Sequence, residues 1–108
     1  MRYCFALDLM DDPTLIKEYE VYHEAVWPDI LQSLKDSGIV DMEIYRVLNR
    51  LFMILDGDES FSFDRKMKMD AVNPRVQEWE KLMWKYQQGL PGLKEDEKWM
   101  PCKMVFKL

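Results

Sequence analysis

The chain has 108 residues, of which 48 % are hydrophobic and 32 % are charged, a balance typical of a folded globular domain. Its formal net charge is -5, its pI is near 4.9, and its Arg and Lys residues form no basic stripe, which argues against binding to nucleic acid or to an anionic membrane. No apolar run approaches the roughly 20 residues that span a bilayer, and the first residues do not resemble a signal peptide. We therefore expect one domain over residues 1–108, located in the cytoplasm.

The first predicted elements are a strand and a helix. Residues 2–9 combine aromatic and aliphatic side chains and indicate a strand. Asp12 suits the N-cap of a helix because its carboxylate accepts hydrogen bonds from the first turn, and Pro13 suits the first helical position. Apolar residues then recur at helical spacing until Pro28, which disfavours helical geometry in the residue before it. We expect the helix to end or kink there.

A second short helix and two strands follow. Residues 29–36 carry an apolar face at helical spacing, and Gly38 is a typical signal for the end of a helix. Residues 39–48 alternate between apolar and polar side chains and predict a strand, whereas residues 51–55 form a continuous apolar run that predicts a central strand. Residues 49–50, Asn-Arg, are the expected hairpin turn, although they lack the glycine that favours one.

The second half of the chain predicts two stretches of helix and a closing strand. We expect helices over 60–69 and 74–88, a polar loop over 89–97 and a strand over 98–108. This order is that of a ferredoxin-like α+β fold, a four-stranded antiparallel sheet with helices on one face. Nine methionines, five phenylalanines and four tryptophans exceed what one small core needs. We therefore expect a homodimer that covers the bare sheet face and forms a dimeric α/β barrel.

The two cysteines and the single histidine do not indicate a metal site. Cys4 and Cys102 lie near opposite ends of the chain, and we expect free thiols in the core, which suits a reducing cytosol. The chain has no paired-cysteine motif to accompany its histidine in a zinc site. Its four glycines form no phosphate-binding loop.

The setting of His23 is the main functional signal. Tyr19 precedes it by four residues and Trp27 follows it by four, so on a helix the three side chains share one face. Histidine is the side chain best suited to transfer protons near neutral pH, while tyrosine adds a hydroxyl and tryptophan a flat apolar surface. This pattern indicates a pocket for a small molecule. The alternatives are a histidine that only fills the core and a tryptophan that only packs at the kink.

Two residues of the last predicted helix are further candidates. Trp79 faces the core by its spacing, so it belongs either to the core alone or to the pocket as well. Glu80 should point away from that face, towards the rim of a cleft.

The motif Tyr19-x-x-x-His23-x-x-x-Trp27-Pro28-Asp29 resembles the signature of the L-rhamnose mutarotase family. The resemblance extends over essentially the whole chain, and it implies a cytoplasmic ferredoxin-like dimer that needs no cofactor. It also implies an isomerase that interconverts the α and β anomers of a 6-deoxy sugar. The other matches, weak when taken singly, are Ile44-Tyr45, the run 51–55, Trp79-x-x-x-Met83 and Met104-Val105-Phe106-x-Leu108.

The resemblance also implies roles for single residues. His23 falls on the proton-transferring histidine, Tyr19 on a sugar-contacting tyrosine that we pair with it in catalysis, and Trp79 on the first of two adjacent sugar-contacting tryptophans. The second of these tryptophans is Glu80 here, and a further sugar-contacting tyrosine is Met42. We expect all five to meet the substrate. The two departures point to a 6-deoxyhexose other than L-rhamnose, with L-fucose as the first expectation.

The chemistry of mutarotation fits these residue types. The reaction opens a hemiacetal and closes it on the other face, so a proton must reach the ring oxygen while another leaves the anomeric hydroxyl. A histidine, with an ordinary pKa of about 6.5, can donate or accept at neutral pH. Trp79 or Trp27 would stack on the apolar face of the sugar. No strong electrophile has to be made, so the mechanism requires no metal.

Two other classes of protein remain open. Ferredoxin-like dimers with apolar clefts also serve as ligand-binding modules or small oxygenases, in which His23 would bind a flat ligand or a haem iron and Trp27 would line the cavity. The absorption spectrum of the purified protein in the visible range separates that class from a mutarotase. In an interaction domain without catalysis, His23 would be buried with its hydrogen bonds satisfied.

Overall fold

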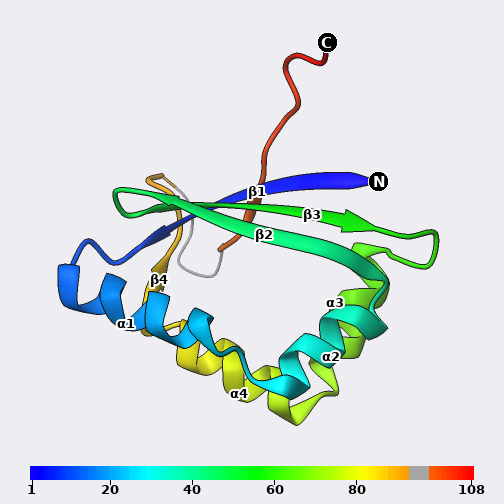
Figure 1. The fold of residues 1–108 in the computed structure, drawn as a ribbon, viewed down its shortest axis with the longest axis horizontal. Coiled ribbons are helices and arrows are strands. Elements are labelled where there is room, and N and C mark those ends of the chain that lie inside the picture. Colours follow the sequence, from blue (N-terminus) through cyan, green and yellow to red (C-terminus); the bar gives the residue numbers. More distant parts are fainter. Residues whose placement is uncertain (93–97) are drawn as a thin grey trace.

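Three long antiparallel strands form most of the sheet. In the computed structural model, which describes residues 1–92 and 98–108, the strand order is β2-β3-β1-β4 (Figure 1). β1 (Arg2–Leu9) pairs with β3 (Arg50–Gly57), and β3 pairs in turn with the edge strand β2 (Ile39–Val47). This is the order of a ferredoxin-like sheet, and the predicted α+β fold class is confirmed.

Two short strands fill the fourth position of the sheet. β4 (Gln87–Gln88) and β5 (Met100–Pro101) both pair antiparallel with β1, one after the other along its free edge. The predicted helix over 74–88 is therefore too long, because α4 (Pro74–Met83) ends before the chain turns into β4. The predicted strand over 98–108 is also wrong, since only two of its residues pair.

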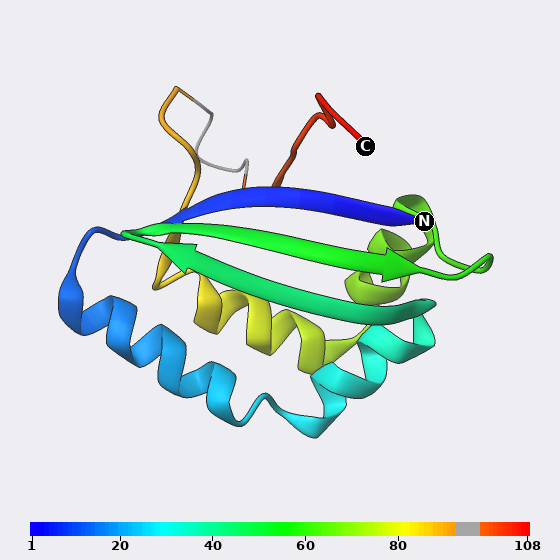
Figure 2. The same ribbon diagram turned by 45° about the horizontal axis from the view of Figure 1, so that its top comes forward.

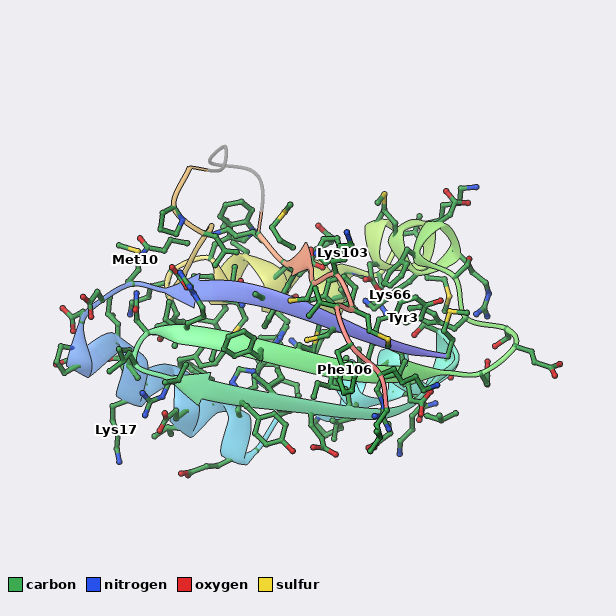
Figure 3. The ribbon with its side chains drawn as sticks, turned by 90° about the horizontal axis from the view of Figure 1, so that it is seen from above. Tyr3, Met10, Lys17, Lys66, Lys103 and Phe106 are labelled. Atoms are coloured by element: carbon green, nitrogen blue, oxygen red, sulfur yellow. The ribbon has the colours of Figure 1, made fainter. Side chains whose placement is uncertain are left out.

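The C-terminal segment beyond β5 leaves the sheet on the face opposite the helices (Figures 1 and 3). Cys102 still donates its backbone N–H to the carbonyl of Cys4 at 2.7 Å. Beyond that bond the segment joins no strand in the described part of the chain, and Met104, Phe106 and Leu108 are exposed. Apolar alternation predicts a strand here, but a strand forms only where a neighbouring backbone completes the hydrogen bonds.

The helices cover one face of the sheet (Figure 2). Among the described residues, none of them is long and apolar enough to cross a membrane. The fold thus has two layers, one sheet and one layer of helices, and the other face of the sheet is open. The helices are α1 (Pro13–Glu24), α2 (Pro28–Asp36), α3 (Phe63–Ala71) and α4 (Pro74–Met83).

Local signals set the start of α1 and the bounds of α2 close to the prediction, whereas α1 ends at Glu24, earlier than the expected end at Trp27. The carboxylate of Asp12 accepts the backbone N–H groups of Thr14 and Leu15 at 2.9 and 3.1 Å, which satisfies donors that the helix itself leaves free. The break between α1 and α2 falls before Pro28, which takes the first position of α2. α2 ends before Gly38, whose φ of +95° allows the reversal into β2.

Other bounds differ from the prediction by a few residues. α3 begins at Phe63 and not at residue 60, because the hydroxyl of Ser62 accepts the backbone N–H of Arg65 at 3.1 Å and makes Ser62 the N-cap. The β2–β3 turn is formed by residues 48–49, one position earlier than predicted. The predicted loop over 89–97 falls partly on residues 93–97, outside the described part of the chain.

The core lies between the sheet and the helices. Its larger cluster packs Leu7 and Leu51 of the sheet against Tyr19 of α1 and Trp79 of α4, all four buried. Burial of such side chains contributes roughly 1.5–3 kcal/mol each, which anchors the helix faces that carry the candidate site. A second cluster lies beneath the other end of the sheet and contains Phe5, Ile39, Leu55 and Phe61.

The two thiols lie next to each other across the β1–β5 edge. Cys4 and Cys102 are both free, as expected. The expectation that both lie in the core is wrong for Cys102, which is exposed, while Cys4 is partly buried. The difference follows from the short β5, because the chain leaves the sheet as soon as it has passed Cys4.

A histidine cleft between α1 and the edge strand

A cleft of about 370 Å³ opens between α1 and the edge strand β2. His23 and Tyr19 stand on successive turns of α1, as their spacing predicts, and their rings lie 4.2 Å apart between centroids. The opposite wall is formed by residues of β2 and β3. Side chains alternate between the two faces of a strand, so every second residue of β2 faces the helices. The residues that line the cleft are Tyr19, Glu20, His23, Glu24, Ile44, Tyr45, Arg46 and Leu51.

One ring nitrogen of His23 is committed to the backbone. Nδ1 lies 2.8 Å from the carbonyl oxygen of Tyr19. A carbonyl oxygen only accepts hydrogen bonds, so Nδ1 carries the proton and donates it. In the neutral ring the other nitrogen, Nε2, is then the acceptor. The helix backbone thus fixes the tautomer and orients the group that can take a proton.

The half-buried position of His23 favours its neutral form. Burial lowers its pKa below the ordinary value, and the hydrogen bond to the carbonyl of Tyr19 opposes that shift in part. Because the ordinary value is about 6.5, a lowered pKa leaves the imidazole neutral at pH 7. A neutral imidazole with a free Nε2 is a general base.

Tyr19 is buried and keeps its proton. Burial raises the pKa of Tyr19 to about 12, and a hydrogen bond with Gln87 of β4 reduces the shift. At neutral pH its hydroxyl is therefore a hydrogen-bond donor and acceptor, not a phenolate. The ring also supports the imidazole by stacking beside it.

Two tryptophans support His23 from the side of the core. Trp79 meets His23 edge-on at 5.6 Å between ring centroids, and Trp27 packs on Trp79 at 5.1 Å. Arg75 covers the ring of Trp27 at 4.3 Å. Trp79 thus contacts His23, as its place facing the core allows. The prediction that Trp27 shares a helix face with His23 is wrong, because α1 ends at Glu24 and Trp27 precedes the first residue of α2. Neither tryptophan is among the residues that line the cleft.

The structure does not bring Met42 and Glu80 to this cleft. Met42 packs against the second core cluster, below the far end of the sheet. Glu80 is exposed, and the charges that act on it belong to Lys66 and Asp70 of α3. Although the residue as a whole is exposed, its carboxyl group is partly shielded from water, and this desolvation, together with the charge of Asp70, raises the pKa of Glu80 above its ordinary value.

Sequence reasoning missed the charged residues of the cleft. Glu20 and Arg46 form an ion pair that joins α1 to β2, and Glu24 lines the cleft beside His23. The sequence did contain one indication of a charged site. Arg46 continues the alternating series of Met42 and Ile44, whose apolar side chains face the helices, so a charge at this position is unusual. Among the described residues, no group of three His, Cys, Asp or Glu side chains is arranged to hold a metal ion.

This arrangement defines an α+β protein of ferredoxin-like fold with a histidine in a cleft beside its sheet. A solved structure, that of L-rhamnose mutarotase from Formosa agariphila, has the same fold, with a TM-score of 0.74 at 23 % identity. The match covers 100 % of this chain and 98 % of that one.

Sequence comparison identifies the family. The family model described as L-rhamnose mutarotase matches residues 2–108, and the chain belongs to this family. It is 42 % identical to an L-fucose mutarotase of Xanthomonas campestris pv. campestris, over 99 % of this chain and 87 % of the relative. It is 29 % identical to an L-rhamnose mutarotase of Sinorhizobium fredii, over 99 % of this chain and 97 % of the relative. The chain is thus an isomerase of the carbohydrate mutarotase class.

Proposed function

We propose that the chain interconverts the α and β anomers of a neutral 6-deoxyhexose, with L-fucose preferred to L-rhamnose, and that His23 carries the proton. The observation that carries the proposal is the fixed tautomer of His23, which presents an unprotonated Nε2 beside a cleft of sugar-binding size. The similarity to an L-fucose mutarotase supports the choice of sugar. The two free thiols suit a reducing compartment such as the cytoplasm.

The charges of the cleft support an uncharged substrate. Glu20 is neutralised by Arg46, and Glu24 adds a further carboxylate beside the neutral His23. A sugar phosphate or a sugar acid would bring a like charge next to Glu24, at a cost in binding energy. Hydroxyl groups, in contrast, both donate to carboxylates and accept from a guanidinium.

The proposed mechanism uses His23 as the base. Nε2 takes the proton of the anomeric hydroxyl, and the bond between the anomeric carbon and the ring oxygen breaks. The imidazolium then returns that proton to the ring oxygen, which was bonded to the same carbon, so His23 ends the step neutral. The aldehyde rotates and the same steps in reverse close the ring on the other face. The hydroxyl of Tyr19, which stays protonated, binds a sugar oxygen and holds the ring against the imidazole. Trp27 and Trp79 hold the imidazole in place from behind.

The sugar preference is tested by exchange spectroscopy. At anomeric equilibrium, saturation-transfer NMR should show faster enzyme-dependent exchange for L-fucose than for L-rhamnose at equal concentration. We expect a difference in transition-state free energy of about 1–3 kcal/mol, the scale of a buried polar group without a partner. Faster exchange of L-rhamnose would contradict the assignment of L-fucose, and exchange of neither sugar would contradict the proposed activity.

We further propose that the chain forms a homodimer through the open face of the sheet. Side chains alternate along β2 and Met42 packs against the core, so Tyr45 and Val47, both more than half exposed, lie on the open face. The C-terminal segment, which carries Met104 and Phe106, projects from the same side. An apolar segment that pairs with no strand of the described residues after Cys102, together with an apolar sheet face, fits a second copy of the same chain.

Light scattering checks the assembly. At micromolar concentration the mass should be twice the 13.1 kDa of one chain, with an interface above about 1,000 Å² in total. The variant Phe106→Asp places a charge in the projecting segment and should shift the equilibrium towards the monomer. Lys107→Asp is its matched control, because it also introduces an acidic side chain in that segment but replaces a residue that is already charged. A monomeric parent protein would contradict the proposal.

A further inference from the structure

We propose that the ion pair of Glu20 and Arg46 forms hydrogen bonds with the hydroxyls at carbons 3 and 4 of the sugar and so determines the preference among 6-deoxyhexoses. The inference rests on the proposed function, because it assumes that a sugar occupies the cleft with its anomeric carbon at His23. It assigns the choice of sugar to residues that the sequence pattern did not single out, in place of Met42 and Glu80.

The pair stands at the right place in the cleft. Glu20 and Arg46 are 26 residues apart in the chain, yet they meet across the space between α1 and β2, and both line the cleft. Glu20 precedes His23 by three residues, so its side chain starts about 5–6 Å from that of His23 on the same helix face. The pair therefore faces one end of a bound ring while His23 faces the other.

The guanidinium is held in a fixed orientation. Nε of Arg46 donates to Oε1 of Glu20, and Nη1 donates to the carbonyl oxygen of Leu48 at 2.6 Å. Leu48 has a φ of 52°, an unusual conformation for a branched residue, and it turns that carbonyl back towards the strand. Two neighbours thus hold one side chain, which lowers the entropy that a ligand would otherwise have to remove.

Hydrogen-bonding groups are left over for a ligand. Within the described residues, Nη2 of Arg46 and Oε2 of Glu20 have no hydrogen-bond partner. One is a double donor and the other an acceptor, and they belong to side chains that touch each other. Two neighbouring hydroxyls complement this set, because one accepts from the guanidinium while the other donates to the carboxylate.

The geometry of a pyranose selects which hydroxyls these are. Mutarotation takes place at carbon 1 and the ring oxygen, and the ring atoms diagonally opposite them are carbons 4 and 3. With carbon 1 and the ring oxygen at His23, the hydroxyls of carbons 3 and 4 therefore lie towards Glu20 and Arg46. L-Fucose and L-rhamnose differ at carbon 4, where the hydroxyl is axial in the first and equatorial in the second, and also at carbon 2. Side chains that bind the hydroxyl at carbon 4 can thus distinguish L-fucose from L-rhamnose without contacting the reacting atoms.

Stability does not account for the pair. The side chains of Arg46 and Glu20 are 38 % and 46 % exposed, and ion pairs at such positions contribute little to folding because water screens them. Substitutions there should leave the fold intact. Arg46→Met retains most of the side-chain stem and removes the guanidinium, and Glu20→Gln retains the shape but replaces the charge by an amide.

The test compares L-fucose with its 4-deoxy analogue in matched variants. In the parent protein, kcat/KM for anomer exchange should fall about 10-fold when the hydroxyl at carbon 4 is missing. In Arg46→Met the two sugars should exchange at nearly equal rates, both lower than L-fucose in the parent and chiefly through a raised KM. Glu20→Gln should reduce the ratio in the same direction. Lys68→Met is the charge-matched control, since Lys68 forms an exposed ion pair with Asp64 on α3, and it should preserve the 10-fold ratio.

The outcomes separate this inference from the proposed function. An active parent with the same ratio of the two sugars in Arg46→Met as in the parent would overturn the reading of carbon 4 and leave the mutarotase intact. If the parent catalyses no exchange, binding of L-fucose followed by NMR decides the matter. Binding that weakens about 10-fold in Arg46→Met and not in Lys68→Met would retain the inference, and binding that is absent or unaffected would overturn it.

Discussion

Replacement of His23 by alanine (His23→Ala) should slow the exchange between the anomers of L-fucose by at least about 10²-fold. The substitution removes Nε2, which is the acceptor that the hydrogen bond of Nδ1 to Tyr19 leaves free. No other histidine in the chain can replace it. Saturation-transfer NMR at neutral pH measures the rate, and thermal unfolding shows whether the fold persists.

Two further variants separate the effect of lost packing from the effect of the lost imidazole. Tyr22→Ala removes an aromatic neighbour of Trp79 from the same helix, as His23→Ala does, but leaves the imidazole in place. It should retain far more activity. His23→Gln retains a polar side chain that can bond the carbonyl of Tyr19 but cannot exchange a proton near pH 7, and it should be as slow as His23→Ala. Exchange at the parent rate in either His23 variant would refute the mechanism.

The parts of the site that sequence reasoning found are local ones. Tyr19 and His23 are four residues apart on one helix, so a correct helix prediction places them together. The start of that helix was predictable because Asp12 and Pro13 act on the backbone of its first turn, and Pro28 marks the start of the next helix after the break. In these cases the residues that determine the local structure lie within one or two helical turns of the feature that they predict.

The parts that it missed depend on contacts between distant elements. Arg46 meets Glu20 only because β2 lies at the edge of the sheet beside α1, which no local pattern specifies. The resemblance predicted Met42 and Glu80 as sugar contacts, yet the packing of β2 and α4 directs them to the second core cluster and to α3. The closing strand was misplaced for the same reason, since apolar alternation does not say which backbone, if any, lies alongside.

Gly38→Ala should destabilise the fold by about 2–5 kcal/mol. Gly38 has a φ of +95°, which costs a residue with a side chain about 1–2 kcal/mol. A Cβ there would also lie 2.6 Å from the hydroxyl oxygen of Ser60, 2.7 Å from a carboxylate oxygen of Asp58 and 3.0 Å from the backbone nitrogen of Phe61. The side chain of Ser60 can rotate away, but the backbone of Phe61 cannot, so overpacking adds roughly 1–3 kcal/mol.

Gly92→Ala is the matched control for this effect. Gly92 has a similar φ of +89°, but a Cβ built on it meets nothing within 4 Å among residues 1–92 and 98–108, so alanine there should cost only the backbone term. Urea unfolding of both variants gives the difference, and Gly38→Ala should have the lower midpoint at an unchanged m-value. Equal midpoints would show that the contacts around Gly38 relax without cost. Because Gly38 leads directly into β2, the strand that carries Arg46, strain at this position should also lower the affinity of the cleft for L-fucose even where the variant remains folded.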